Sequence, residues 1–206
     1  MQLNALTKPF GRVSIQPAGV PRSESGVGWR KRTVDRSSLT HVERLFADDE
    51  VIVTKTDPQG RITYANRVFC RLAGLSERDA IGKPHNVIRH PDMPKCVFKL
   101  LWDTIRSGRE IFAYVVNRAV TGDHYWVFAH VTPTFGPDGA ITGYHSNRRT
   151  ADPRIVGGVI VPVYRMLLEE ERKHANSRDG MEAATALLGK VLREKGLDYD
   201  RFIFSL

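Results

Sequence analysis

The chain contains very little cysteine, with only Cys70 and Cys96 among 206 residues. Two thiols are too few for a disulfide scaffold or for a four-cysteine zinc site. Long apolar runs are lacking too: the uncharged stretch 155–164 has ten residues, against the ~20 that span a bilayer. The N-terminus lacks the apolar core of a secretory signal. These absences predict a cytoplasmic protein with no membrane span.

Signatures of catalysis are also missing. The sequence has no Gly-rich phosphate loop, no Gly-x-Ser-x-Gly elbow, and no histidine-kinase phospho-acceptor or ATP-lid pattern. His85 and His90 alone do not supply the three or four ligands of a zinc site. We therefore expect no enzymatic activity and no metal site.

Charge is distributed unevenly along the chain. The net charge is +8, and residues 1–40 carry +5 of it, because they hold seven basic and two acidic residues. Residues 1–37 also contain three prolines, and their apolar residues do not recur at the spacing of a helix or a strand. This composition predicts a disordered basic arm. No aromatic residues are interleaved with the basic ones, so we expect a solvated arm and no nucleic-acid partner.

The hydrophobic periodicity of the middle of the chain predicts an α+β domain over residues 38–152. Strands are expected where β-branched and alternating residues occur, and helices where apolar residues recur every three to four positions. The expected strands are 51–56, 61–65, 111–119, 124–132 and 141–149, and the expected helices are 38–49, 67–73, 76–81 and 95–107. This order describes one five-stranded antiparallel sheet with helices inserted between strands two and three.

Residues 153–206 are expected to form a C-terminal helical extension. Apolar stripes predict one helix from about 155 to 175 and a second from about 177 to 196. Two interpretations stay open: the helices are an output element that signals or dimerises, or they pack across the domain's own face. The apolar end 202–206 would tuck into that packing or dock on a partner.

Residues 85–94 are the most unusual stretch, since a loop of ten residues there holds two His, one Arg, one Asp and one Asn. Arg89 offers a planar donor fork for phosphate or carboxylate, His90 can donate or accept, and Asp92 can accept from hydroxyl groups. The stretch is therefore a candidate site for a polar ligand. In the alternative interpretation, Arg89 and Asp92 pair with each other and Asp92 caps the helix that follows.

Five segments together resemble a PAS domain of the aerotaxis-receptor type, over roughly residues 45–152. They are Asn66–Gly74, Pro84–Pro94, Asn117–Arg118, Gly122–Val127 and Gly143–Arg148. The resemblance implies a PAS fold that binds FAD non-covalently and reports the redox state of electron transport to the chemotaxis machinery. Where the family usually has a Trp that is associated with flavin retention, this chain has Ile111 followed by Phe112.

The resemblance also implies which residues would belong to the flavin site. The amide of Asn117 could meet an edge of the flavin ring, where it would sense a change of charge and hydrogen bonding on reduction. The candidate cofactor-binding residues are His85, Asn86, Arg89, His90, Asp92, Trp102 and Asn117. The membrane anchor and long coiled coil of the receptors have no counterpart here. We therefore expect a detached sensor that contacts a chemotaxis or two-component protein, and that could also form a homodimer.

Other functions compete with the flavin hypothesis. A cofactor-free PAS domain would serve only for dimerisation and partner docking, and a haem-based gas sensor could use His85, His90, His124 or His130 as an axial ligand. A flavin–thiol photoreceptor is disfavoured, because neither cysteine lies in the required sequence context. The absorption spectrum of the purified protein would separate these alternatives.

Overall fold

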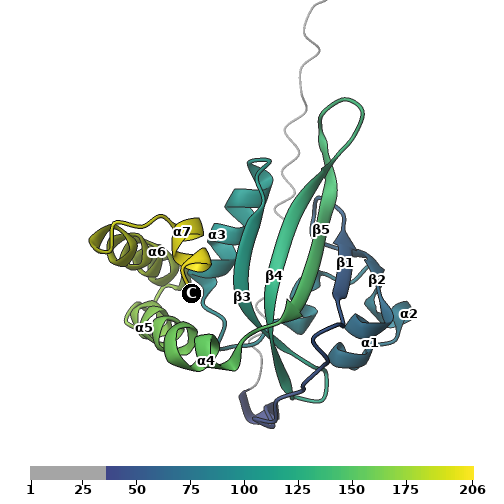
Figure 1. Cartoon of the computed structure of the whole chain (residues 1–206), viewed down its shortest axis with the longest axis horizontal. Helices are drawn as coiled ribbons and strands as arrows, with labels where there is room; N and C mark the ends of the chain where they lie inside the picture. Colours follow the sequence, from purple (N-terminus) through teal and green to yellow (C-terminus); the bar gives the residue numbers. More distant parts are fainter. Residues whose placement is uncertain (1–35) are drawn as a thin grey trace, which may run out of the picture. The chain divides into compact units, whose positions relative to one another are not determined.

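A five-stranded antiparallel sheet forms the centre of the computed structural model, which describes residues 36–206 (Figure 1). In space the strands follow the order β2-β1-β5-β4-β3. Their bounds are β1 Ile52–Thr56, β2 Ile62–Ala65, β3 Ile111–Arg118, β4 His124–Phe135 and β5 Ile141–Thr150. The predicted α+β class and the insertion of helices between the second and third strands are confirmed.

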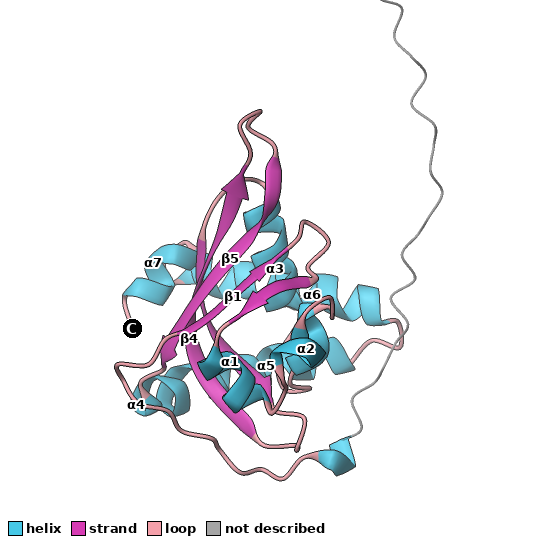
Figure 2. Ribbon diagram, turned by 90° about the vertical axis from the view of Figure 1, so that its right-hand side faces the viewer, coloured by secondary structure: helices cyan, strands magenta, loops and turns pink. Residues whose placement is uncertain are grey.

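The helices lie in two groups, one between β2 and β3 in the chain and one after β5 (Figures 1 and 2). The first group consists of α1 Arg67–Ala73, α2 Glu77–Ala80, the 3₁₀ turn η2 His85–Ile88 and α3 Lys95–Arg106. The second consists of α4 Pro153–Ile155, the π-helical turn η3 Val156–Ile160, α5 Val161–Arg172, α6 Ser177–Glu194 and α7 Tyr199–Phe204. A short 3₁₀ turn, η1 Arg36–Ser38, precedes the sheet.

The start of α1 is fixed by the side chain of Asn66, as the sequence predicts. Its Oδ1 accepts hydrogen bonds from the backbone N–H groups of Phe69 and Val53, and its Nδ2 donates to the carbonyl of Val51. One amide therefore caps a helix and ties it to β1. Gly74 ends α1 in the left-handed conformation, with φ of 70°, where glycine carries no steric penalty.

Side chains of the central strands alternate between two covered faces. The inner face is turned toward α1, η2 and α3, and Ala113, Val115, Val127 and Ala129 lie on it, all at most 6% exposed. The opposite, outer face carries Phe112, Tyr114, Val116, Trp126 and Phe128. The inner face is covered throughout, whereas Asn147 and Arg149 on the outer face of β5 are exposed, so part of the outer face meets solvent, as is common in antiparallel sheets.

Helices α5 and α7 cover part of the outer face. The ring of Tyr164 in α5 lies 6.1 Å from that of Trp126, and its hydroxyl donates to the carbonyl of Tyr114. Phe204 in α7 meets Phe112 edge-on at 4.8 Å. The predicted C-terminal helices thus pack on the domain itself, and the apolar end of the chain belongs to this packing, with Ile203 only 4% exposed.

The first C-terminal helix is not uniform, because Pro162 lies within it. Proline has no N–H to donate, and its ring clashes with the carbonyl four residues earlier in a regular α-helix. The chain widens into the π-helical turn η3 just before this residue, and the N–H of Val161 donates to the carbonyl of Val156. The expected single helix is therefore α4, η3 and α5 in succession.

The helix expected over residues 38–49 is wrong. Apart from η1, the chain there runs beside the start of β4. The N–H of Arg44 donates to the carbonyl of His124, and the N–H of His124 donates to the carbonyl of Val42. These backbone groups make sheet-like bonds, so they are not available for helical ones. The apolar period that suggested a helix leaves Val42 57% and Leu45 82% exposed.

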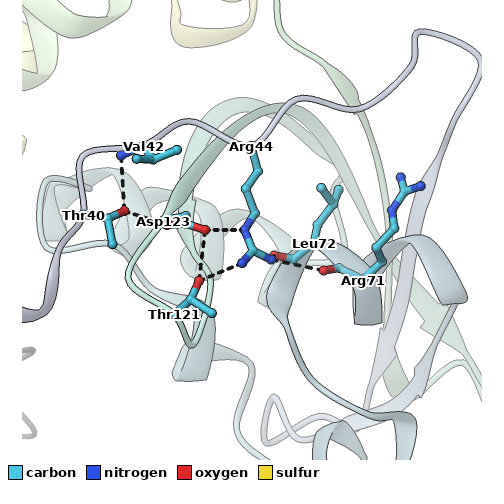
Figure 3. A network of polar contacts seen from close by, with 7 residues as sticks. All are labelled: Thr40, Val42, Arg44, Arg71, Leu72, Thr121 and Asp123. Carbon is cyan, nitrogen blue, oxygen red and sulfur yellow. Dashed lines mark hydrogen bonds and ion pairs between the residues drawn. The ribbon is translucent and has the colours of Figure 1, made fainter.

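The side chain of Arg44 holds this segment in place (Figure 3). Its guanidinium donates to Asp123 and Thr121, both at 2.7 Å, and to the carbonyls of Leu72 and Arg71 at 3.0 and 3.2 Å. One arginine thus joins three separate parts of the chain. The formation of these tertiary bonds explains why the local helical period is overridden.

The expected disordered arm, residues 1–37, lies outside the described residues except for Arg36 and Ser37. Between residues 36 and 206, no helix is long and apolar enough to cross a membrane.

Candidate functional site

Polar side chains gather on the inner face of the sheet, where apolar packing would be expected. We call this group the inner-face polar cluster. It consists of Thr54, Thr56, His85, Asn117, Tyr125, Ser146 and Arg148. The strands β1, β3, β4 and β5 supply six of these residues, and η2 places His85 over them. Elements distant in the sequence therefore converge on one polar area inside the domain.

Arg148 is the centre of the cluster. Its side chain is buried, and Nη2 donates to Thr54 Oγ1 at 2.9 Å and to His85 Nε2 at 2.7 Å. Burial lowers the pKa of Arg148 to about 10, which still leaves it charged at neutral pH. Within residues 36–206, no carboxylate forms an ion pair with this guanidinium. A buried cation without a counter-charge is costly, which favours an electron-rich ligand beside it.

The contact with Arg148 fixes the state of His85. Guanidinium nitrogens can only donate, so Nε2 of His85 must be the unprotonated, accepting nitrogen. Burial and the nearby Arg148 charge lower the pKa of His85 to about 3. The imidazole is therefore neutral over the whole physiological range.

Several atoms of the cluster are buried and lack a hydrogen-bond partner among the described residues. They are Thr56 Oγ1, Asn117 Nδ2, Tyr125 Oη, Ser146 Oγ and Arg148 Nη1. Buried polar groups are nearly always paired, so five such atoms on one face of one sheet form an exception that needs an explanation. A ligand with hydrogen-bond donors and acceptors at these positions would satisfy them.

Asn117 also links this cluster to the loop 85–94. Its backbone pairs with that of Arg89 in an isolated antiparallel bridge at the edge of β3. This bridge anchors the end of η2, which carries His85. Two of the predicted site residues, His85 and Asn117, are thus brought to the same face of the sheet.

The side chain of Arg89 turns away from the inner face. Its guanidinium lies over the ring of Phe98, 4.5 Å from the centroid, and donates to the carbonyl of Met93 at 3.4 Å. Burial lowers the pKa of Arg89, and the charge of Glu171 on α5 opposes that shift. The Arg89 guanidinium is therefore held by α3 and by its own loop, and the charge of Glu171 acts on it.

The alternative in which Arg89 pairs with Asp92 and Asp92 caps α3 is wrong. Asp92 pairs with Arg36, at 2.6 Å. The N-terminus of α3 follows Pro94 and is capped instead by Glu171, whose Oε1 accepts from the N–H of Cys96 at 2.9 Å. This cap comes from a distant helix, so no local pattern could have predicted it.

His90 and Asp92 lie on the outer side of the sheet. The Nδ1 of His90 accepts from the backbone N–H of Asp92 at 3.1 Å, and its ring lies 5.8 Å from that of His124. Burial and neighbouring positive charges lower the pKa of His90 to about 4. Both residues line a hollow between β4 and α5.

The remaining predicted site residues lie elsewhere. Trp102 on α3 meets Tyr144 edge-on, with ring centroids 5.5 Å apart, and covers the turn at Gly60. Asn86 is exposed. Of the seven predicted residues, only His85 and Asn117 thus share the inner-face polar cluster.

Neither thiol is activated as a nucleophile would be. Burial raises the pKa of Cys96 to about 12, and the pKa of Cys70 is also raised by burial. Both stay protonated at neutral pH, so neither has the thiolate character of a reactive cysteine. Within the described range, no three His, Cys, Asp or Glu side chains lie close enough together to hold a metal ion.

Sequence reasoning missed Thr54, Thr56, Tyr125, Ser146 and Arg148. One signal was present, since Tyr144, Ser146 and Arg148 alternate along β5 and so share a face. The other face of the same strand carries His145, Asn147 and Arg149, which are equally polar. Polarity therefore could not tell which face is buried.

The matched family model is described as the PAS fold and covers residues 40–146. This chain belongs to the PAS family. It is 37% identical over 153 residues to the aerotaxis receptor of Escherichia coli K12. The match covers 74% of this chain and 30% of the receptor. The resemblance to the aerotaxis-receptor type is thereby confirmed.

More distant relatives share the PAS region. The nitrogen fixation regulatory protein of Klebsiella pneumoniae is 27% identical over 99 residues, or 48% of this chain and 20% of that protein. Rice phototropin-2 is 25% identical over 141 residues, and the match covers 62% of this chain and 16% of phototropin-2. This PAS chain therefore spans less than a third of each curated relative named here. A solved light-oxygen-voltage domain matches with a TM-score of 0.49 and 15% identity, covering 61% of this chain and 90% of the domain.

Proposed function

We propose that this chain is a redox- or oxygen-sensing PAS protein that holds FAD non-covalently on the inner face of its sheet. Its output would be contact with a signalling partner of the chemotaxis or two-component kind. The observation that carries the proposal is the buried Arg148, which has no counter-charge among the described residues, together with the five buried polar atoms of the cluster, Arg148 Nη1 included, that have no hydrogen-bond partner there. The relative named an aerotaxis receptor supports the sensory role.

The donor set fits a flavin ring. An amide, two kinds of hydroxyl and a guanidinium can donate to, or accept from, the nitrogens and carbonyl oxygens along one ring edge. A bound flavin supplies electron exchange, which changes the charge and hydrogen bonding of its ring nitrogens. Arg148 would stabilise added negative charge, and Asn117 could reorient its amide in response.

Contacts and one charge interaction connect this face with the C-terminal helices. The loop carrying His85 continues to Arg89, and the charge of Glu171 on α5 acts on the Arg89 guanidinium by raising its pKa. The same Glu171 caps α3 through the N–H of Cys96. A shift of the loop would thus change contacts made by α5. Of the predicted residues, we assign His85 and Asn117 to flavin contact and Arg89 to positioning.

The absorption spectrum of the purified chain, reconstituted with FAD, tests the proposal. We expect flavin bands, and we expect Arg148→Met to weaken FAD binding at least about tenfold, equivalent to about 1.4 kcal/mol. The matched control is Arg149→Met, which removes the neighbouring but exposed guanidinium and should leave binding unchanged.

Each other outcome contradicts the proposal in a distinct way. A Soret band would indicate haem, and a clear spectrum after reconstitution would indicate a cofactor-free interaction domain. Equal FAD affinity in the Arg148→Met and Arg149→Met proteins would place the flavin elsewhere. Circular dichroism of both variants distinguishes lost binding from lost folding.

A further inference from the structure

A hollow exists on the opposite side of the sheet from the inner-face polar cluster. It has a volume of about 380 Å³ and lies between the β3–β4 pair and helix α5. Val116 and Trp126 line it, and each is the sequence neighbour of a residue that faces inward, Asn117 and Tyr125. Because successive side chains of a strand point to opposite faces, the two sites cannot be the same. The proposed flavin function therefore leaves this hollow unexplained.

The floor of the hollow is apolar. Val116 and Trp126 come from the sheet, and Val161 and Leu168 come from α5. The two helix residues are seven positions apart, so they lie on one face of α5, with the first beside the π-helical turn η3. An indole and three aliphatic side chains make a surface suited to a flat, apolar body.

The rim is positively charged. Arg165 and Arg172 line the hollow from α5, and within residues 36–206 neither forms an ion pair. The imidazoles of His41, His90 and His124 complete the rim. A lining with two free guanidinium groups favours an anion, which they can bind in bidentate fashion.

The single carboxylate in the lining does not offset this charge. Asp92 is already paired with Arg36, at 2.6 Å. Arg118, two positions beyond Val116 on the same face of β3, has a buried Nε without a hydrogen-bond partner among the described residues. His90 also presents a donor, because its Nδ1 accepts from the N–H of Asp92 and its Nε2 therefore carries the hydrogen.

We infer that this outer-face hollow binds a small organic anion, a carboxylate attached to a flat apolar body. The volume lies within the range of about 300–1,000 Å³ typical of small-molecule sites, which combine an apolar lining with a few placed polar groups. The body would lie against Trp126, and the carboxylate would meet Arg165 and Arg172. Because α5 forms one wall, the bound anion would stabilise the packing of this helix on the sheet.

The probe is 2-naphthoate, compared with its uncharged isostere 2-naphthamide and with inorganic phosphate. Calorimetry on the full chain gives affinities, and ¹H–¹⁵N NMR locates the binding. We expect 2-naphthoate to bind at least about tenfold more tightly than the amide or phosphate, and to shift the indole N–H of Trp126. Measurements with and without FAD separate this site from the flavin site.

Two variants and a control test the assignment. The double change Arg165→Gln with Arg172→Gln should reduce 2-naphthoate affinity at least about tenfold without changing that of the amide. Leu168→Trp should fill the hollow and abolish binding of both. The control Arg78→Gln with Arg149→Gln removes the same charge from exposed sites elsewhere.

Four results would overturn the inference. They are equal binding of 2-naphthoate and 2-naphthamide, equal loss of affinity in the control, NMR shifts confined to inner-face residues such as Ser146, and absence of binding. Loss of flavin absorbance alone would bear on the proposed function and leave this inference standing.

Discussion

Arg148 and His85 form an uncommon pair, since a buried guanidinium donates to an imidazole where a carboxylate would be its usual partner. The imidazole must remain neutral to accept this bond. Protonation of His85 would place two positive charges 2.7 Å apart inside the domain. The pair therefore links the stability of the fold to pH.

We expect stability to fall as the pH decreases below about 6.5. The pKa of His85 is lowered to about 3 and that of His90 to about 4, while an exposed imidazole titrates near pH 6.5. Between these values the unfolded chain binds protons that the folded chain excludes. The free energy of unfolding then falls by up to about 1.4 kcal/mol per pH unit for each excluded proton. Urea titrations at several pH values measure this slope.

Variants identify the source of the pH dependence. His85→Gln should decrease the slope between pH 6.5 and 5, because glutamine can still accept from Arg148 and does not titrate. His174→Gln removes a more exposed imidazole at the end of α5 and serves as the control. A slope that is the same in the natural chain and in His85→Gln would contradict the argument.

The segment 40–46 shows how tertiary contacts decide the state of an element. Its backbone pairs with the start of β4, and the guanidinium of Arg44 joins it to the β3–β4 turn and to the end of α1 (Figure 3). Arg71 provides a useful comparison, since it also binds a carboxylate, Glu50, at 2.7 Å but is far more exposed.

Arg44→Met should therefore cost more than Arg71→Met. Two of the four hydrogen bonds of the Arg44 side chain are partly buried, and its removal leaves Asp123 and two carbonyls without this partner. We expect this to lower the free energy of unfolding by about 1–3 kcal/mol. The exposed Arg71 pair should contribute about 0–1 kcal/mol. Urea unfolding gives both values, and hydrogen exchange at the amide of Arg44 should accelerate only in the first variant. Equal costs would show that the network does not hold the segment.

Two glycines of α6 differ in what surrounds them. A Cβ on Gly180 would overlap the carbonyl oxygen of Glu171, because the backbones of α5 and α6 approach closely there. A Cβ on Gly189 would meet only the flexible end of Arg193. The same substitution should therefore have opposite effects at the two positions.

Gly180→Ala should destabilise the chain by about 1–3 kcal/mol, since rigid backbone atoms must move apart. Gly189→Ala should stabilise it by about 0.4–1 kcal/mol through the higher helix propensity of alanine. Thermal unfolding measures the sign of each change. Similar effects at both positions would mean that α5 and α6 do not pack as closely as described.

At the scale of the whole molecule, the C-terminal helices act as a cover for the outer face. They shield Phe112, Trp126 and Tyr114 from water, and Glu171 caps α3 across the interface. The aromatic part of the outer face, on β3 and β4, is thus covered while the helices stay in place. Displacement of α5 by a partner would expose one.

Truncation after Ala151 should therefore produce a self-associating protein. Each large apolar side chain that becomes exposed loses a burial free energy of about 1.5–3 kcal/mol, which association with another chain can restore. We expect light scattering to show larger species than the full chain forms at equal concentration, with increased binding of an apolar dye. Flavin binding should persist in the truncated chain, because the proposed FAD site lies on the inner face and the removed helices cover the outer face. A monomeric truncated chain would contradict the role of the helices as a cover.

Local rules predicted the regular part of the fold. Three elements depend on neighbours within a few residues and could therefore be predicted from the sequence. They are the β1–β2 hairpin, the cap of α1 by Asn66 and the amphipathic helix α3. The helix expected over 38–49 failed because Arg44 finds its partners at Asp123 and Leu72, far away in the sequence. The single helix expected from about 155 to 175 was wrong in the same way, because its apolar stripe did not reveal the π-helical turn η3 before Pro162.

The sequence by itself determined the α+β class, the succession of strands and helices along the chain and the PAS resemblance, because these depend on periodicity and on short motifs. Only the tertiary structure decided which polar residues meet. The run 85–94 looks like one site, yet η2 turns His85 toward the inner face while His90 lines the outer hollow. The physical reason is that between these two histidines the backbone of Arg89 pairs with Asn117 at the edge of β3. Within the strands, moreover, successive residues face opposite sides of the sheet, so the residues that form a site come from four strands and a 3₁₀ turn.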